Sequence, residues 1–392
     1  MEFIDSDEDS FEEEIENLPI LMDNIDDENY NAVEIIGANI NGIQRIQHIK
    51  VINYIESIVR NYIETDFTMH FRLSREVAYD LIGRFEISQI YMDLQVFAGY
   101  EPMTAEKHML CFLWFVGHQT ASYRDVADRF GISISALHKL ITRVTCFLVS
   151  LSARIIRLPT VQEREVTKQF YLGTKGFPGV VGAIDGTHIR IDRPSEDKDS
   201  YINRKQYFSI HMQGVVDHNK KIIDICVGYP GSVHDARVFR ESIISTKLED
   251  FCGDDGYILG DTAYPCLKHL LVPYKDRGHM TRAQVKFNQK LSSCRVVVEN
   301  AFGSLKQRFR QLYYMKLKNI VRLIEIIVAC CVLHNLANAN DLQLFEPPIN
   351  DEDPDDEVQI VPNANVDENV ANDSDDGKLL RDELCRQFAM RN

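Results

Sequence analysis

The sequence predicts an α/β domain with a mixed central sheet, preceded by an all-helical region and flanked by two acidic tails. Three observations lead to this fold class. Strand-like and helical runs alternate after residue 178, amphipathic helices separated by glycines occur before it, and acidic residues are concentrated at both ends. Such an order of strands and helices is typical of a sheet with helices packed on its faces.

The two ends of the 392-residue chain carry most of its negative charge. Residues 1–28 hold 13 acidic residues and no basic one, and residues 342–377 hold 12 acidic residues and no basic one. The net charge of −16 therefore belongs to the ends, and the body between them is mildly basic. Because segments rich in like charge are usually disordered, we expect acidic disordered tails over 1–33 and 339–392. They act either as solvated termini or as polyanion mimics that screen a basic surface.

Composition excludes several classes of protein. No run of about 18 apolar residues predicts a membrane-spanning helix, so we expect no membrane partner. The N-terminus is acidic where a secretory signal would be basic and then apolar. The nine cysteines include no Cys-x-x-Cys pair, which argues against a zinc ribbon and for free thiols in a reducing compartment. Cys330 and Cys331 lie in an apolar helical run and are expected in the core.

The helical region is expected over residues 34–160. Weak helical periodicity over 34–63 is followed by a helix over 71–85 that Ser74 can cap. A helix that starts at Thr104 then covers residues 104–117.

A helix-turn-helix pattern, placed at about 104–149, ends this region. A short helix over 121–130 stops at Gly131, and a longer helix over 133–149 is capped by Ser133. This pattern either docks its second helix in the major groove of DNA or forms a helical subdomain that binds nothing. In the first case the DNA-contacting side chains are Ser135, His138, Lys139 and Arg143.

The α/β region is expected over residues 161–338. Its predicted elements are strands over 180–184, 206–217 and 221–229, a helix over 231–244, strands over 255–261 and 269–274, and a long helix over 282–314. His218 and Asn219 form the turn of a hairpin between the second and third strands. Ser232 and Asp235 have the spacing of a capping box at the start of the first helix.

Three acidic residues are expected near one another in this region. Asp185 ends the first strand, Asp261 ends the fourth, and Glu299 lies beside the apolar seam of the long helix. Strand ends and a flanking helix are where open α/β sheets build sites. Clustered carboxylates repel unless a cation lies between them, and oxygen ligands suit Mg²⁺ or Mn²⁺. Two such ions could activate a water or a 3′-hydroxyl and stabilise the leaving oxygen in phosphoryl transfer.

Each acid also has a purely structural explanation. Asp185 and Gly186 could form a hairpin turn, Asp261 could cap the segment after it, and Glu299 could pair with Arg295 four residues earlier. A two-carboxylate glycosidase accounts for neither the third acid nor the basic surroundings. Neighbours at one helix start, such as His234 and Asp235, cannot form a hydrolase relay.

Several ordered motifs resemble one family. They are SYRDVADRFGIS at 122–133, AIDGTHI at 183–189, NRKQYFSIHMQGVVD at 203–217, GSVHDARVF at 231–239, GDTAYP at 260–265, FNQKLSSCRVVVENAFGSLKQRF at 287–309 and VLHN at 332–335. Over roughly residues 70–338 the sequence resembles the PIF/Harbinger-type DDE transposases and the domesticated Harbinger transposase-derived nucleases.

The resemblance implies a ribonuclease H-like catalytic core. It also implies that Asp185, Asp261 and Glu299 bind two divalent metal ions, either Mg²⁺ or Mn²⁺. It implies DNA as substrate, a metal-dependent endonuclease or transposase-type reaction at DNA ends, and a Myb-like DNA-binding partner. It also implies a location in the nucleus, and the cytoplasm stays open as a second location. Assembly into a homo-oligomer also stays open.

Other residues near the motifs are assigned supporting roles. Basic side chains expected to contact DNA phosphates are Arg204, Lys205, Arg295 and Lys306. Residues expected around the metal ligands are His188, His234 and Asp235, although Asp235 is also suited to the positive start of a helix. A domesticated DNA- or chromatin-binding protein that keeps the fold without cleavage is the alternative. The three intact acids favour the nuclease.

Overall fold

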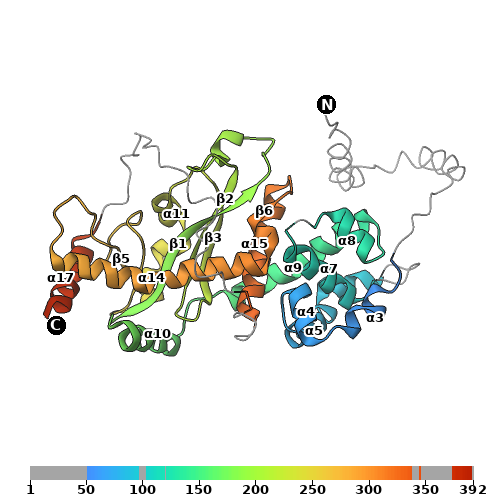
Figure 1. The fold of residues 1–392 in the computed structure, drawn as a ribbon, viewed down its shortest axis with the longest axis horizontal. Helices are drawn as coiled ribbons and strands as arrows, with labels where there is room; N and C mark the ends of the chain where they lie inside the picture. Colours follow the sequence, from blue (N-terminus) through green and yellow to red (C-terminus); the bar gives the residue numbers. More distant parts are fainter. Residues whose placement is uncertain (1–50, 97–102, 120, 338–343, 346–372, 391–392) are drawn as a thin grey trace, which may run out of the picture.

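The structure, a computed structural model, describes residues 51–96, 103–119, 121–337, 344–345 and 373–390. The predicted acidic leader over 1–33 and most of the helical run over 34–63 lie outside these residues. A helical region and an α/β region lie side by side along the long axis of the molecule (Figure 1).

Among the described residues, eight α-helices precede the sheet. They are α3 (Tyr54–Ser57), α4 (Glu64–Phe71), α5 (Arg75–Glu86), α6 (Gln89–Met92), α7 (Ala105–Gly117), α8 (Tyr123–Arg129), α9 (Ile134–Ile155) and α10 (Val161–Lys175). Serine or threonine side chains accept backbone N–H hydrogen bonds at the starts of α5, α7, α8 and α9. The helix starts at Ser74, Thr104 and Ser133 are therefore confirmed.

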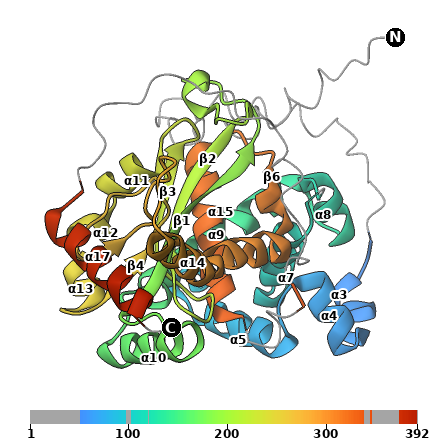
Figure 2. The ribbon, with the colours of Figure 1, turned by 60° about the vertical axis from the view of Figure 1, so that its left-hand side comes forward.

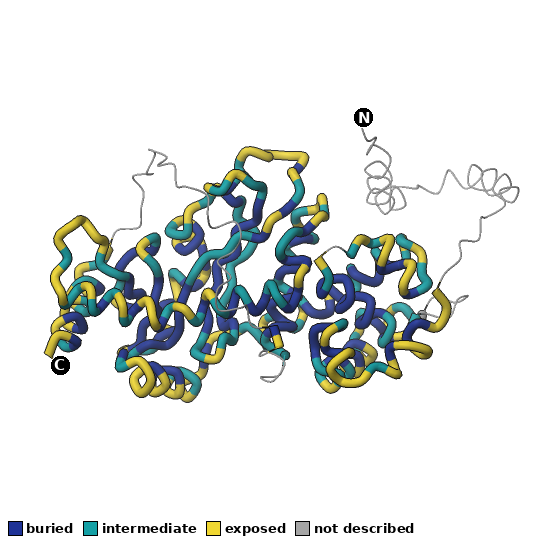
Figure 3. The backbone as a smooth tube through the Cα atoms, viewed as in Figure 1, coloured by how far each residue is buried: buried dark blue, intermediate teal, exposed yellow. Residues whose placement is uncertain are grey.

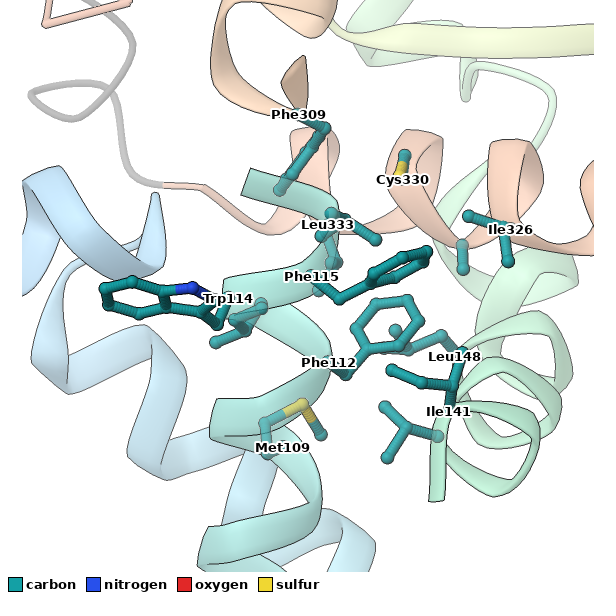
Figure 4. Close-up of a cluster of buried hydrophobic side chains, with 14 of the residues drawn as sticks. Met109, Phe112, Trp114, Phe115, Ile141, Leu148, Phe309, Ile326, Cys330 and Leu333 are labelled. Atoms are coloured by element: carbon teal, nitrogen blue, oxygen red, sulfur yellow. The ribbon is translucent and has the colours of Figure 1, made fainter. Parts of the chain in front are cut away.

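Helix α7 is the centre of this region, because it is mostly apolar and is buried from His108 to Gly117. Figure 4 shows its Met109, Phe112 and Phe115 beside side chains of α9 and of the later helix α15 (Ile320–Leu336). Cys330 and Cys331 of α15 are fully buried, as expected, and all nine cysteines are free thiols.

Helices α8 and α9 have the predicted arrangement of a short helix, a turn and a longer helix. A capping box of Ser122 and Asp125 starts α8, and Gly131 in the turn has φ of 66°, where glycine is favoured. In the part of the chain that the structure describes, α9 is the one helix long and apolar enough to span a membrane by length and composition. Its apolar residues include Leu137, Leu140 and Val144, which are buried in the core shared with α7.

The α/β region is a six-stranded mixed sheet with helices around it. Its strands are β1 (Val180–Ile191), β2 (Ser209–Val216), β3 (Ile222–Pro230), β4 (Tyr257–Leu259), β5 (Leu270–Leu271) and β6 (Tyr314–Met315). The order across the sheet is β3-β2-β1-β4-β5, and β6 pairs with the far end of β1. Strands β1, β2 and β3 are antiparallel neighbours, whereas β4 and β6 run parallel to β1. The mixed sheet and the hairpin turn at His218 and Asn219 are confirmed.

The first strand is longer than predicted. It continues through Asp185 and Gly186 to Ile191, because Thr187 to Arg190 keep pairing with β2 as far as Ser209. Asp185 therefore lies inside a strand, and both the strand-end prediction and the hairpin-turn explanation are wrong.

The helix after β3 is shorter and is capped differently from the prediction. Instead of one helix over 231–244, the chain forms α11 (Asp235–Glu241), α12 (Ile243–Thr246) and α13 (Leu248–Cys252). His234 is the N-cap residue and makes no side-chain capping bond, so the capping box of Ser232 and Asp235 does not form. Asp235 turns its carboxylate towards the sheet instead, as described below.

Helix α14 (Arg282–Arg308) crosses the sheet and connects the two regions (Figures 1 and 2). Its C-terminal half, including Val298, Phe302 and Leu305, belongs to the core that also contains α7, α9 and α15. Its N-terminal half, including Phe287 and Leu291, belongs to a second core with α10 and α13. One helix therefore holds the sheet against both cores. Figure 3 shows the sheet mostly in the buried and intermediate colours, whereas loop tips are exposed.

The C-terminal part of the chain contains an ordered helix, α17 (Asp375–Met390). Its Phe388 is buried against Phe177 and Phe287, with ring centroids 5.0 and 6.0 Å apart. Asp373 and Ser374, which precede the helix, bond the backbone N–H and C=O of Cys266. The predicted disordered tail over 339–392 is therefore wrong for residues 373–390, because four apolar side chains spaced along α17 give it a face that packs on the core.

Candidate active site

Two of the three predicted acids come from the neighbouring parallel strands β1 and β4, with Asp185 inside β1 and Asp261 two residues after the end of β4. Ala183 of β1 pairs with Leu259 of β4, and Asp185 and Asp261 each follow two residues after this pair. Asp185 is held inside β1, where its side chain is 19% exposed. Asp261 follows β4, and its Oδ1 accepts a 2.9 Å hydrogen bond from the backbone N–H of Ala263. Asp261 thus shapes the turn that follows it as well as facing Asp185.

Both aspartates have raised pKa values. Burial raises the pKa of Asp185 to about 6, against the opposing effect of Arg295, and the negative charge of Asp261 raises it further. Burial likewise raises the pKa of Asp261 above its ordinary value, although the Ala263 N–H lowers it. Two desolvated carboxylates that repel each other indicate a position where a cation would be bound.

Glu299 reaches the same place from α14 through an arginine. Arg295 Nη2 lies 2.6 Å from Glu299 Oε1, and Arg295 Nη1 lies 2.7 Å from Asp185 Oδ2. The i,i+4 pair considered from the sequence is present, but the same guanidinium also binds Asp185, 110 positions earlier in the chain. Glu299 is 51% exposed, so it forms the solvent side of this cluster.

A second polar cluster lies on the opposite face of β1. Side chains alternate along a strand, so Gly186 and His188 face away from Asp185. His188 pairs across the strands with His211 of β2, and His211 Nε2 lies 3.0 Å from Asp235 Oδ1. The missing side chain of Gly186 makes this possible, because a Cβ there would lie 2.0 Å from Asp235 Oδ1.

These groups influence one another's protonation. Burial opposes ionisation of Asp235, but the hydrogen bond and charge of His211 lower its carboxyl pKa below the ordinary value. Burial lowers the pKa of His188 to about 4, and His211 lowers it further. His188 Nδ1 is paired with the Ser209 hydroxyl at 3.1 Å. His188 and Asp235 therefore support β1 on the side opposite Asp185, but the negative charge of Asp235 still raises the pKa of both Asp185 and Asp261. His234 is exposed at the start of α11.

The residues predicted to bind DNA differ in their solvent exposure and in their contacts. Ser135, Lys139 and Arg204 are exposed, whereas His138, Arg143 and Lys205 are partly buried. Lys306 is directed inward, where its Nζ donates to the His188 carbonyl at 3.0 Å. Arg295 is directed at the carboxylates. In the structure Lys306 and Arg295 both have internal partners, and their predicted contacts with DNA phosphates stay predictions.

The carboxylate cluster has the donor chemistry for a hard divalent cation, since every candidate ligand is an oxygen. Within the residues that the structure describes, no three acidic, histidine or cysteine side chains stand close enough together to hold one ion. Arg295 lies between Asp185 and Glu299 and pairs with both carboxylates.

Two residues near the cluster were not predicted from the sequence. His211 orients Asp235, and it could have been found from its position opposite His188 once the strands were paired. Tyr264, buried three residues after Asp261, has a pKa raised well above its ordinary value by burial and by the charges of Asp235 and Asp185. Nothing in the local sequence distinguishes it from other core tyrosines.

Comparisons with known proteins bear on the same residues. Residues 184–335, which include Asp185, Asp261 and Glu299, match a family described as DDE superfamily endonuclease. The chain is 30% identical over 253 residues to "Putative nuclease HARBI1" of Mus musculus, covering 63% of this chain and 71% of that protein. It is 29% identical over 258 residues to the protein of the same name from Homo sapiens, with the same coverage. It is 27% identical over 286 residues to "Protein ALP1-like" of Arabidopsis thaliana, covering 68% and 67%. No solved structure matches the chain.

Proposed function

Because the chain belongs to the Harbinger transposase-derived nucleases within the DDE superfamily endonucleases, we propose that it cleaves phosphodiester bonds of DNA. The reaction is metal-dependent, and Asp185, Asp261 and Glu299 hold two divalent ions, Mg²⁺ or Mn²⁺. The observation that carries this proposal is that Asp185 and Asp261 each lie two residues after the paired Ala183 of β1 and Leu259 of β4, with Glu299 joined to Asp185 through the Arg295 side chain.

The protein's own residues have distinct roles in this proposal. Asp185 and Asp261 are fixed by strand pairing and a backbone hydrogen bond, so they provide a rigid pair of oxygen ligands. Glu299 is more exposed and completes the site from α14. Bound ions would activate a water or a 3′-hydroxyl and stabilise the leaving oxygen. The ribonuclease H-like core proposed here is the mixed sheet of β1 to β5 with α14 across it.

Basic residues outside the cluster position the DNA. Arg204 is exposed in the loop before β2, and Ser135 and Lys139 are exposed on α9. We assign α8 and α9 the role of a DNA-binding helix-turn-helix, in which α9 contacts bases or phosphates. The protein works in the nucleus with a separate Myb-like DNA-binding partner. These assignments rest on the family and on the pattern of the two helices.

Nicking of labelled DNA in Mg²⁺ or Mn²⁺ tests the proposal. Asp261→Asn keeps the side-chain size and removes one metal-binding charge, so we expect loss of cleavage with DNA binding retained. Asp254→Asn is the matched control, because Asp254 is an exposed aspartate in the turn before β4. If neither the wild type nor the control cleaves DNA that they bind tightly and salt-sensitively, the chain is a DNA- or chromatin-binding protein instead.

A further inference from the structure

Arg295 occupies the centre of the carboxylate cluster. One guanidinium forms two short ion pairs, at 2.7 Å to Asp185 and 2.6 Å to Glu299, and the arginine side chain is only 19% exposed. These two acids come from different elements, β1 and α14, so the arginine ties the helix to the strand. Although burial alone would lower it, the charges of Asp185 and Glu299 raise the pKa of Arg295 above its ordinary value.

A guanidinium and a divalent metal ion make the same demand on these carboxylates. Each is a cation that binds carboxylate oxygens, and in the proposed site each uses oxygens of Asp185 and Glu299. The Arg295 contacts at 2.6 and 2.7 Å already use one oxygen of each acid. An arginine guanidinium and a metal ion bound to the same carboxylates would be two positive charges a few ångströms apart, and these repel strongly in a partly desolvated site. The other oxygen of Asp185 accepts a hydrogen bond from the backbone N–H of Gly186 at 2.9 Å, so a metal ion would compete with Arg295 for these carboxylates.

We propose that Arg295 is a built-in counter-cation that competes with the metal for Asp185 and Glu299. Without metal it neutralises the cluster and holds α14 to β1; metal binds only when its side chain leaves. The inference rests on the proposed metal-dependent function, and it assigns a role to a residue that the sequence pointed to as a DNA contact.

Metal can bind only those molecules in which the Arg295 side chain does not contact Asp185 and Glu299. The apparent dissociation constant for metal is therefore the dissociation constant of the open site divided by the fraction of such molecules. If the arginine-bound arrangement is favoured by about ten to one, the apparent dissociation constant for metal is about tenfold higher than that of the open site. The helix itself need not move, because rotation of a long arginine side chain is enough to release both oxygens.

Mn²⁺ titration of the full chain by calorimetry tests this competition. Arg295→Gln removes the charge while keeping a polar side chain, and we expect it to bind Mn²⁺ about tenfold more tightly than the wild type. Arg282→Gln is the matched control, because Arg282 is an exposed arginine in the first turn of the same helix. Its affinity for Mn²⁺ should equal that of the wild type. Without metal, Arg295→Gln should melt at a lower temperature than Arg282→Gln, and Mn²⁺ should narrow that difference.

A measurement on the unmodified protein covers the case in which Arg295→Gln does not fold. With ¹⁵N-arginine labelling, the Arg295 guanidinium signal should shift and exchange faster with water as Mg²⁺ is added. Equal or weaker Mn²⁺ binding by Arg295→Gln, or an Arg295 signal that Mg²⁺ leaves unchanged while binding is measured, would overturn the competition alone. Absence of Mn²⁺ binding in every form, including the wild type, would overturn the proposed metal site and this inference together.

Discussion

His211 Nε2 lies 3.0 Å from Asp235 Oδ1 on the face of β1 that points away from Asp185. His211 Nδ1 also bonds the Val233 carbonyl at 2.9 Å, and the histidine side chain is 2% exposed. The imidazole thus joins β2 to the residues that precede and begin α11. The pair supports the middle of β1 from behind.

We expect His211→Ala to destabilise the protein by about 2–4 kcal/mol, because it leaves the Asp235 carboxylate buried without its partner. Urea denaturation measures the change in the free energy of unfolding. His279→Ala, at an exposed position in the loop before α14, is the control and should change stability by less than about 0.5 kcal/mol. Equal stability of the two variants would contradict a structural role for the His211–Asp235 pair.

Gly186→Ala should disturb the same pair from the strand side. The new Cβ would lie 2.0 Å from Asp235 Oδ1 and 2.4 Å from His211 Nε2, and those two groups hold each other in place. We expect a loss of about 1–3 kcal/mol, as for other overpacked positions. Gly83→Ala is the control, since nothing lies within 4 Å of a Cβ there and alanine favours helix α5. Thermal melts should therefore move in opposite directions for the two variants.

Metal affinity should rise with pH between pH 5 and 7. The pKa of Asp185 is raised to about 6 in the folded protein, so the folded protein binds this proton more tightly than the unfolded chain and is stabilised when Asp185 is protonated. That stabilisation is fully present below the unfolded-state pKa of about 4 and is lost as pH rises through 6. Metal needs the ionised carboxylate, so its binding follows the opposite trend and releases a proton.

Mn²⁺ titrations at several pH values, in two buffers of different ionisation enthalpy, measure both the affinity and the proton release. Asp254→Asn should reproduce the wild-type profile, whereas Asp185→Asn should abolish binding. An affinity that stays constant from pH 5 to 7 would show that Asp185 is not a ligand.

Phe388→Ala should destabilise the protein, because its ring is buried among Phe177, Phe287 and the Lys290 ammonium, which lies 4.8 Å from the ring centroid. Truncation of a core phenylalanine costs about 3–5 kcal/mol. Met390→Ala removes a side chain that is 81% exposed on the same helix and should have no measurable effect on unfolding by urea. If both variants unfold at the same urea concentration, α17 is not part of the cooperative structure.

The sequence predicted the elements whose signals are local. The helix starts at Ser74, Thr104 and Ser133 are predictable because a hydroxyl residue just before an apolar helical run usually caps the N-terminus of the helix. The β2–β3 hairpin was found because the turn residues separate two strand-like runs. Asp185-Gly186 shows the limit of this reasoning: the dipeptide favours a turn, but pairing of Thr187 to Arg190 with β2 overrides that preference.

The remaining differences come from contacts between distant parts of the chain. Ser232 and Asp235 have capping-box spacing, yet Asp235 is taken by His211 from another strand. Arg295 looks like a basic residue on a helix surface, and only the fold brings it to Asp185. The charge of the C-terminal segment predicts a disordered tail. The apolar face of α17 stabilises a helix only because it packs against the second core, and the local sequence does not reveal that contact. The family motifs mark the three acids more clearly than their spacing does.

Helix α17 also changes where the chain can be divided. The segment shared with DDE superfamily endonucleases ends at residue 335, yet the apolar surface around Phe177 and Phe287 is covered by a helix that starts at residue 375. Ancestry and folding therefore set different boundaries in this protein. A fragment cut at the edge of the shared segment would expose aromatic rings to water and should aggregate, so expression of the catalytic part requires the helix near the far end of the chain.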